Sequence, residues 1–159
     1  MNRKTQIQEL KQLEKILRVR EQRAVSAYKT ARGLLQEIEE RKSGYADKLQ
    51  HLDEDLDSVA AFKNSLDTIT GAKNFQDAQN FRRWIVYDQE ETSFYHDKAV
   101  GDLASQQEEC AKLRKTMIKA DRKHKEIQKL LLREKSKQSQ HEEELSDVEL
   151  EDTLNAFAS

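Results

Sequence analysis

The sequence predicts an all-α protein, a long antiparallel two-helix coiled-coil hairpin followed by a flexible acidic tail, and three observations lead to this fold class. None of the 159 residues is proline, the residue least compatible with helix interiors. Apolar residues make up 36% of the chain and charged residues another 36%, which is too little apolar material for a thick core but enough for a narrow helix contact. The apolar residues also recur at alternating steps of three and four, the spacing of a helix that packs on another helix.

The first helix is expected over residues 8–69, and its apolar positions define a seam, the line of residues that faces the partner helix. The early seam residues alternate in steps of three and four, with Arg20 in one polar place: Leu10, Leu13, Leu17, Ala24, Ala27, Ala31 and Leu34. After Ile38 the apolar set moves to Tyr45, Leu49, Leu52, Leu56, Val59, Phe62, Leu66 and Ile69. This change contains a stutter, a step of four directly after another step of four, which locally unwinds a supercoil. Because Gly44 lies at the same point, we expect a bend there.

A short turn should end the first helix near Gly71, because glycine suits the left-handed position that follows a helix. Asn74, with Asp77 three residues later, can then cap a second helix over residues 75–134. Its expected seam begins with Phe75, Ala78, Phe81, Trp84 and Ile85 and becomes regular at Ala99, Leu103, Gln106, Cys110, Leu113, Met117, Ala120, His124, Ile127 and Leu131. The hairpin would therefore occupy residues 1–135, and the polar and acidic residues 136–159 would form a tail that cannot fold alone.

Folding two helices back about the centre of this turn also predicts which residues meet. The numbers of opposed residues should add up to about 144, which places seam against seam along the hairpin. Ala31 should then lie near Leu113, and Arg20 should lie opposite His124. A single polar layer of that kind can fix the register of a coiled coil.

Charge is distributed in blocks, although the whole chain carries a net charge of only −2. Residues 1–23 carry +4 and residues 111–137 carry +8, whereas the tail from residue 138 carries −7. In an antiparallel hairpin the two basic blocks are neighbours, so their cations form one outward-facing surface suited to an anionic partner. Nine residues are expected to carry this surface: Lys11, Lys15, Arg18, Arg23, Lys115, Lys119, Arg122, Lys125 and Lys129.

Aromatic residues are concentrated at the opposite end of the expected hairpin, mostly within residues 75–95. Packing within the tip is the simpler explanation, but two helices cannot bury so many large rings. We therefore expect a partner surface there. The residues expected to form it are Phe62, Phe75, Phe81, Trp84 and Tyr87.

No combination of residues predicts catalysis, a cofactor or a metal site. The four histidines lack the i, i+4 spacing of a zinc-binding helix, and the isolated glycines form no phosphate-binding loop. Cys110 occupies a seam position without an activating neighbour. No apolar run approaches the ~20 residues of a membrane span, and no signal-peptide pattern is present, so a cytoplasmic protein without direct membrane insertion is expected.

The run from Leu17 to Tyr28, LRVREQRAVSAY, resembles the N-terminal helix of the YscO/FliJ family, the small stalk proteins of bacterial type III secretion and flagellar export. The resemblance covers residues 8–135 in size and plan, whereas the acidic tail matches nothing in the family. It implies a non-enzymatic protein of the bacterial cytoplasm, peripheral to the secretion apparatus. One end of the hairpin would enter the hexameric ring of the export ATPase, and the other would contact the export-gate protein. Some family members also bind secretion chaperones, which adds a third class of partner.

Two other functions fit the same composition. A general coiled-coil scaffold would pair its seam with a second chain, but the turn near Gly71 and the matched seams favour a monomeric hairpin. A nucleic-acid-binding hairpin would place the basic surface on phosphates, but the acidic tail would compete for that surface. The stalk interpretation is therefore preferred, with no nucleic-acid partner.

Overall fold

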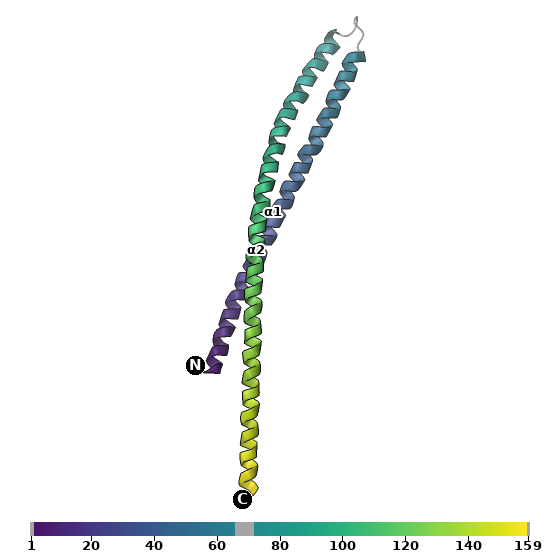
Figure 1. Ribbon diagram of the computed structural model, residues 1–159. Coiled ribbons are helices and arrows are strands. Elements are labelled where there is room, and N and C mark those ends of the chain that lie inside the picture. Colours follow the sequence, from purple (N-terminus) through teal and green to yellow (C-terminus); the bar gives the residue numbers. More distant parts are fainter. Residues whose placement is uncertain (1, 66–71, 159) are drawn as a thin grey trace. The chain divides into compact units, whose positions relative to one another are not determined.

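The computed structural model describes residues 2–65 and 72–158, and these form two helices (Figure 1). Helix α1 spans Arg3–Ser65 and helix α2 spans Ala72–Ala158. No strand occurs in the described part of the chain. The predicted all-α class is confirmed.

The N-terminal ends of both helices differ from the prediction. Helix α1 begins at Arg3 instead of residue 8 because Asn2 caps it: the side-chain Oδ1 accepts a hydrogen bond from the Lys4 amide at 3.2 Å. Helix α2 begins at Ala72, so Asn74 lies inside the helix and its predicted capping role is wrong. The predicted end of the first helix at residue 69 and the turn at Gly71 lie outside the described residues.

Helix α2 continues to Ala158, so its predicted end near residue 134 is wrong and the flexible tail is not confirmed. Every described side chain from residue 139 onward is exposed. Local bonds one turn apart support the helix here, including one from the Gln138 side chain to Glu142 at 2.9 Å. Neither proline nor glycine interrupts this segment, and Glu, Leu, Ala and Gln are good helix formers.

The two helices contribute to two compact units, each containing a segment of both. Unit 1 comprises residues 1–29 and 112–159, and unit 2 comprises residues 30–111. In unit 1, Arg3 pairs with Glu134 at 3.7 Å, and Glu14 contacts His124. In unit 2, Ala31 contacts Gln106, Lys48 contacts Asp88, and Lys63 contacts Gln79. Within each unit the partner numbers on α2 therefore fall as those on α1 rise, which is consistent with a helical hairpin.

The seam of α1 follows an alternation of three and four without a stutter. Its buried and half-buried members in unit 1 are Ile7, Leu10, Glu14, Leu17, Glu21, Ala24 and Tyr28. In unit 2 they are Ala31, Leu35, Ile38, Lys42, Tyr45, Leu49, Leu52, Leu56, Val59 and Lys63. The predicted seam positions Leu13, Arg20, Ala27, Leu34 and Phe62 are exposed, so these five assignments and the stutter are wrong. Both series share Leu10, Leu17, Ala24 and Ala31. At each place between them the buried or half-buried residue lies one position after the predicted one, as Glu14 does after Leu13.

The seam of α2 agrees better with the sequence. All ten residues predicted from Ala99 to Leu131 are buried or half-buried, and the same spacing extends back through the polar Gln89, Thr92 and His96. Phe75, Phe81 and Trp84 are exposed, so their predicted seam role is wrong. The buried core of unit 2 instead consists of Leu52, Val59, Ala78 and Ile85, with Leu56 packed against it.

The observed contacts depart from the predicted register by up to about one heptad, although Glu21 with His124 stays within one residue of the predicted sum of 144. The carbonyl oxygen of Ala31 accepts a hydrogen bond from the Gln106 side chain at 2.9 Å, although Ala31 was expected beside Leu113. Lys48 likewise pairs with Asp88 at 3.0 Å, where the predicted register requires His96. A seam that repeats every seven residues presents the same face after a slip of one repeat, so spacing alone does not select the register.

Candidate protein-binding surfaces

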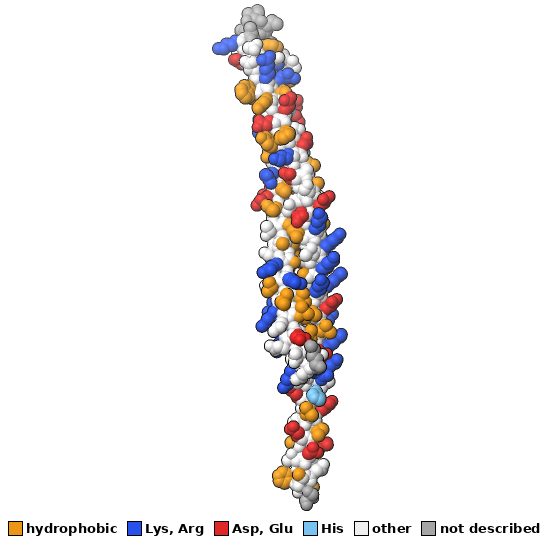
Figure 2. Space-filling view, turned by 90° about the vertical axis from the view of Figure 1, so that its left-hand side faces the viewer, with side chains coloured by type: hydrophobic (Ala, Val, Ile, Leu, Met, Phe, Trp, Pro, Cys, Tyr) orange, Lys and Arg blue, Asp and Glu red, His pale blue; other side chains and the backbone are white. Residues whose placement is uncertain are grey.

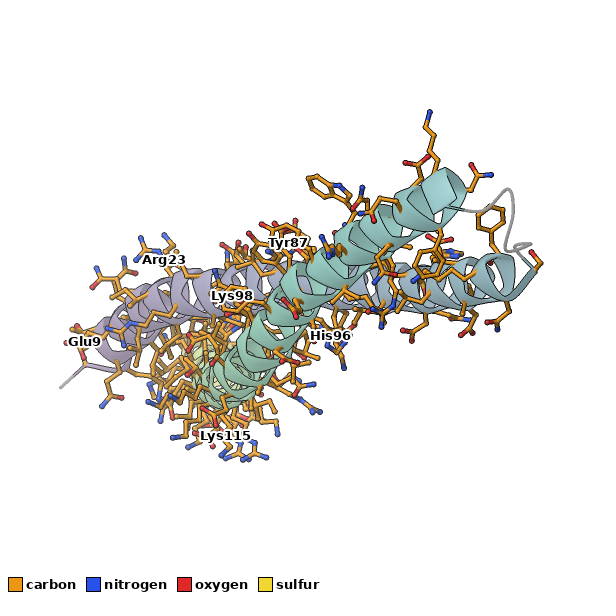
Figure 3. All side chains as sticks on the ribbon, turned by 90° about the horizontal axis from the view of Figure 1, so that it is seen from above. Glu9, Arg23, Tyr87, His96, Lys98 and Lys115 are labelled. Atoms are coloured by element: carbon orange, nitrogen blue, oxygen red, sulfur yellow. The ribbon has the colours of Figure 1, made fainter. Side chains whose placement is uncertain are left out.

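All nine residues predicted to form the basic surface lie in unit 1 and have exposed side chains. Figure 3 shows Arg23 and Lys115 extending away from their helices. The residues of the α1 and α2 seams form the helix contact within the unit. The long basic side chains lie outside the seams and therefore face water. The sequence therefore predicted the exposure of this set, which we call the basic surface.

Two of the nine cations are held by carboxylates of their own helix. The Arg18 guanidinium donates from Nη2 to both oxygens of Glu14, at 2.7 and 2.8 Å, in a bidentate contact. The Lys125 ammonium lies 3.0 Å from Asp121. Arg18 and Lys125 therefore have structural roles that the sequence did not reveal, in addition to any role on the basic surface.

Glu14, Glu21 and His124 form a polar layer in the seam of unit 1. Glu14 is 7% exposed and His124 is 8% exposed. The His124 ring bonds to Glu14 through Nε2 at 2.9 Å and to Glu21 through Nδ1. Ionised carboxylates only accept hydrogen bonds, so both ring nitrogens must donate. A protonated imidazolium, which donates from both ring nitrogens, therefore fits this geometry.

The pKa shifts of the groups in and beside this layer favour their charged forms. The pKa of His124 is raised above its ordinary value of 6.5, chiefly by its hydrogen bond to Glu14 and against the desolvation caused by burial. The pKa of Glu14 is lowered from 4.5, first by the hydrogen bond from His124 and then by the one from Arg18. The Lys125 hydrogen bond lowers the pKa of the neighbouring Asp121 from 3.8. Each charged group thus stabilises the charge of its partner.

The predicted polar layer at His124 is present, but Arg20, its predicted partner, is wrong. Arg20 is exposed, and the seam position next to it is occupied by Glu21. Opposite charge was the signal that could have identified the correct residues, because a cation facing His124 would repel an imidazolium. Two glutamates seven residues apart on one face supply the matching negative charge.

A basic groove lies between α1 and α2 in unit 1. Its described lining comprises Lys11, Glu14, Lys15, Arg18, Gln128, Leu131, Leu132 and Lys135. Leu131 and Leu132 supply its apolar surface, and the Leu132 side chain is 67% exposed. Four cations accompany one carboxylate, and that carboxylate is bound by Arg18 and His124. The groove therefore combines an apolar strip with positive charge.

The predicted aromatic surface lies entirely in unit 2. Phe62, Phe75, Phe81, Trp84 and Tyr87 are all exposed, from 48% for Phe62 and Phe75 to 71% for Trp84. Trp84 and Tyr87 meet edge to face, with ring centroids 6.5 Å apart, and the Lys63 ammonium lies 5.1 Å from the Phe75 ring centroid. These rings contribute little to the core formed by Ala78 and Ile85. Their exposure suits contact with a partner.

Two shallow grooves border these rings. One is lined by Asp55, Ser58, Val59, Phe62, Asn74, Asp77, Ala78 and Phe81. The other is lined by Leu52, Asp55, Phe81, Trp84, Ile85, Tyr87, Asp88 and Glu91. Carboxylates are present in both, and no lysine or arginine is among their described lining residues. These two grooves are therefore acidic, in contrast to the basic groove of unit 1.

The described residues contain no group of three or more His, Cys, Asp and Glu side chains that could hold a metal ion, and Cys110 is buried. None of the helices in this part of the chain is apolar over a stretch long enough to cross a bilayer. The two surfaces must be interpreted from their own geometry and charge, because the chain matches no family model, no curated protein and no solved structure.

Proposed function

We propose that this chain is a non-enzymatic coupling stalk of a bacterial type III export apparatus, built as an antiparallel coiled-coil hairpin. The paired seams of α1 and α2 support the coiled coil, because alternating steps of three and four are the signature of knobs-into-holes packing. Contacts within each unit that pair rising with falling residue numbers support the antiparallel direction. The resemblance of the run from Leu17 to Tyr28 to YscO/FliJ proteins supplies the function.

The exposure of the basic surface is the observation that carries this proposal. A ring-shaped ATPase with an acidic or carbonyl-lined bore attracts such a surface over a Debye length of ~8 Å. Many shallow charge contacts also let a shaft seat without locking in one rotational position. The end of the hairpin that contains both termini is accordingly the end that enters the ring in the bacterial cytoplasm.

In this proposal the aromatic surface contacts the export-gate protein and secretion chaperones. Exposed Trp and Tyr side chains are frequent centres of protein interfaces. Trp84 and Tyr87 are the most exposed of the five predicted residues, which suits them to that task.

Charge reversal tests the ring contact. We would replace four exposed cations that no contact described above engages, as Arg23→Glu, Lys115→Glu, Lys119→Glu and Arg122→Glu. Arg18 and Lys125 are left intact because they bind Glu14 and Asp121. Helix content and thermal stability should change little, since exposed charges contribute little to stability. Stimulation of the type III export ATPase by the purified protein should be lost.

A matched control carries four charge reversals at exposed acidic residues of unit 2, Asp47→Lys, Asp57→Lys, Glu90→Lys and Asp97→Lys. This variant should stimulate the ATPase like the parent. If instead the basic-surface variant stimulates normally and an aromatic-surface variant does not, the hairpin enters the ring by its other end. Binding of the parent to RNA that falls steeply with salt, without ATPase stimulation, would favour the nucleic-acid alternative.

A further inference from the structure

The C-terminal part of α2 has one face that is acidic at its beginning and apolar at its end. Residues 143, 147, 150, 154 and 157 follow steps of four and three and therefore share a face of the helix. Leu150, Leu154 and Phe157 on this face are 59%, 67% and 86% exposed. Figure 2 shows acidic and apolar side chains interspersed at this end of α2. We call this set the tail face.

The tail face complements the basic groove of unit 1. The groove offers Leu131 and Leu132 between cations, and the tail face offers apolar anchors next to Glu143 and Asp147. Amphipathic helices bind apolar grooves through anchors at i, i+4 and i+7, which is the spacing of Leu150, Leu154 and Phe157. Opposite charge favours this occupant over a neutral helix.

The two sites cannot meet within one molecule. Both lie on α2, which is continuous from Ala72 to Ala158. A helix rises ~1.5 Å per residue, so Leu132 and Leu154 of one copy are roughly 30 Å apart along the axis. An occupant with this chemistry must therefore come from another copy of the chain.

We propose that two copies associate through their α2 helices, each tail face filling the basic groove of the other copy. An antiparallel pair of α2 helices satisfies both contacts at once, because the spacing from groove to tail face is the same in each copy. Such a contact is self-complementary and closes as a two-fold dimer. Near the two-fold axis, Arg3 and Lys4 line a groove together with His141 and Glu142, and these cations offset the acidic residues that meet there.

The dimer goes beyond the proposed coupling function and does not depend on it. The sequence predicts a monomeric hairpin because its seam is satisfied internally, and the tail face lies outside the seam shared by α1 and α2. Dimerisation would cover Lys11, Lys15 and Arg18, which belong to the basic surface. An anionic partner of that surface would therefore compete with self-association.

Sedimentation velocity across a concentration series tests the dimer. The parent should change from monomer to dimer as concentration rises, and Leu154→Asp should remain monomeric. Val148→Asp is the matched control, because it adds the same charge at a residue that is 53% exposed but lies on another face of the helix. It should dimerise like the parent. A parent that stays monomeric up to about 100 μM, or equal behaviour of the two variants, would overturn the proposal.

A charge swap provides a stricter test of the groove. The groove variant carries Lys11→Glu, Lys15→Glu and Lys135→Glu, and the tail variant carries Glu143→Lys and Asp147→Lys. Each variant alone places like charges in contact and should be monomeric, whereas an equimolar mixture should form a heterodimer. Circular dichroism verifies that each variant is helical before mixing. A mixture that remains monomeric although both variants are folded would exclude this interface.

Discussion

The imidazole of His124 on α2 lies 2.9 Å from the carboxylate of Glu14 on α1, and both side chains are buried in the seam of unit 1. A coiled-coil seam is normally apolar, and a lone polar residue there commonly selects one register. Here the second ring nitrogen also bonds to a carboxylate, that of Glu21. The layer therefore fits the charged form of His124 and makes the helix contact of unit 1 sensitive to pH.

Thermal stability should fall as pH rises through the raised pKa of His124. The folded-state pKa of His124 is raised, so its contribution is fully present below 6.5 and is lost as pH passes through the raised value. The folded-state pKa of Glu14 is lowered, so its contribution is present above 4.5 and is lost as pH falls through the lowered value. The layer should therefore contribute most between these two values. Circular dichroism melting at about pH 6 and about pH 9 measures the difference.

The His124→Gln variant is the control for that prediction. Glutamine can hydrogen-bond but stays neutral, so the loss of stability on the alkaline side should shrink or disappear in this variant. At about pH 6 the variant should melt below the parent, because the buried Glu14 and the half-buried Glu21 lose their cation. An unchanged alkaline loss in His124→Gln would show that another group is responsible.

Disulfide cross-linking should report the register of unit 2. Cysteines at Ala31 and Gln106 in a Cys110→Ser background should form a disulfide within one chain under mild oxidation, because the Gln106 side chain reaches the Ala31 carbonyl. The pair Ala31→Cys and Leu113→Cys should cross-link more slowly, since the structure places the Gln106 side chain, not Leu113, against the Ala31 carbonyl. Faster cross-linking of the second pair would restore the register predicted from the sequence.

Alanine at three helical glycines should stabilise the protein. Gly33, Gly44 and Gly101 lie within α1 and α2, none has a positive φ, and an added Cβ at each meets no neighbouring atom within 4 Å. Each Gly→Ala change should therefore raise the free energy of unfolding by ~0.5–1 kcal/mol through lower chain entropy in the unfolded state. Urea unfolding measures this gain. The matched reverse change, Ala46→Gly at an exposed position of α1, should lose a similar amount.

Two neighbouring residues of α2 should respond in opposite ways to truncation. Ile85 is 4% exposed in the core of unit 2, so Ile85→Ala should cost ~2 kcal/mol of unfolding free energy or more. Trp84 is 71% exposed, so Trp84→Ala should change stability by less than ~0.5 kcal/mol. Binding to the export-gate partner should be reduced by Trp84→Ala. A large stability loss in Trp84→Ala would assign the ring to the core instead.

The sequence by itself determined the two long helices, but not where they end, and one of the two seams. Absence of proline and the alternating apolar spacing were sufficient for two long helices, because helix formation depends on local propensity and on the periodicity of one face. From Ala99 to Leu131 all ten predicted seam residues are buried or half-buried, so the predicted seam is correct there. The nine cations of the basic surface were also predicted as exposed, because long charged side chains avoid a narrow apolar contact.

Tertiary structure decided which residues are buried and which register is adopted, because both depend on the opposite helix. Leu13 and Glu14 fit the local spacing equally well, and only His124 across the interface explains why the more polar residue is buried. The register was undetermined for a related reason, since a repeat of seven residues fits itself again after a slip of one repeat. Contacts such as Gln106 with Ala31 remove this ambiguity, because a hydrogen bond joins two particular residues whereas apolar periodicity specifies only a face.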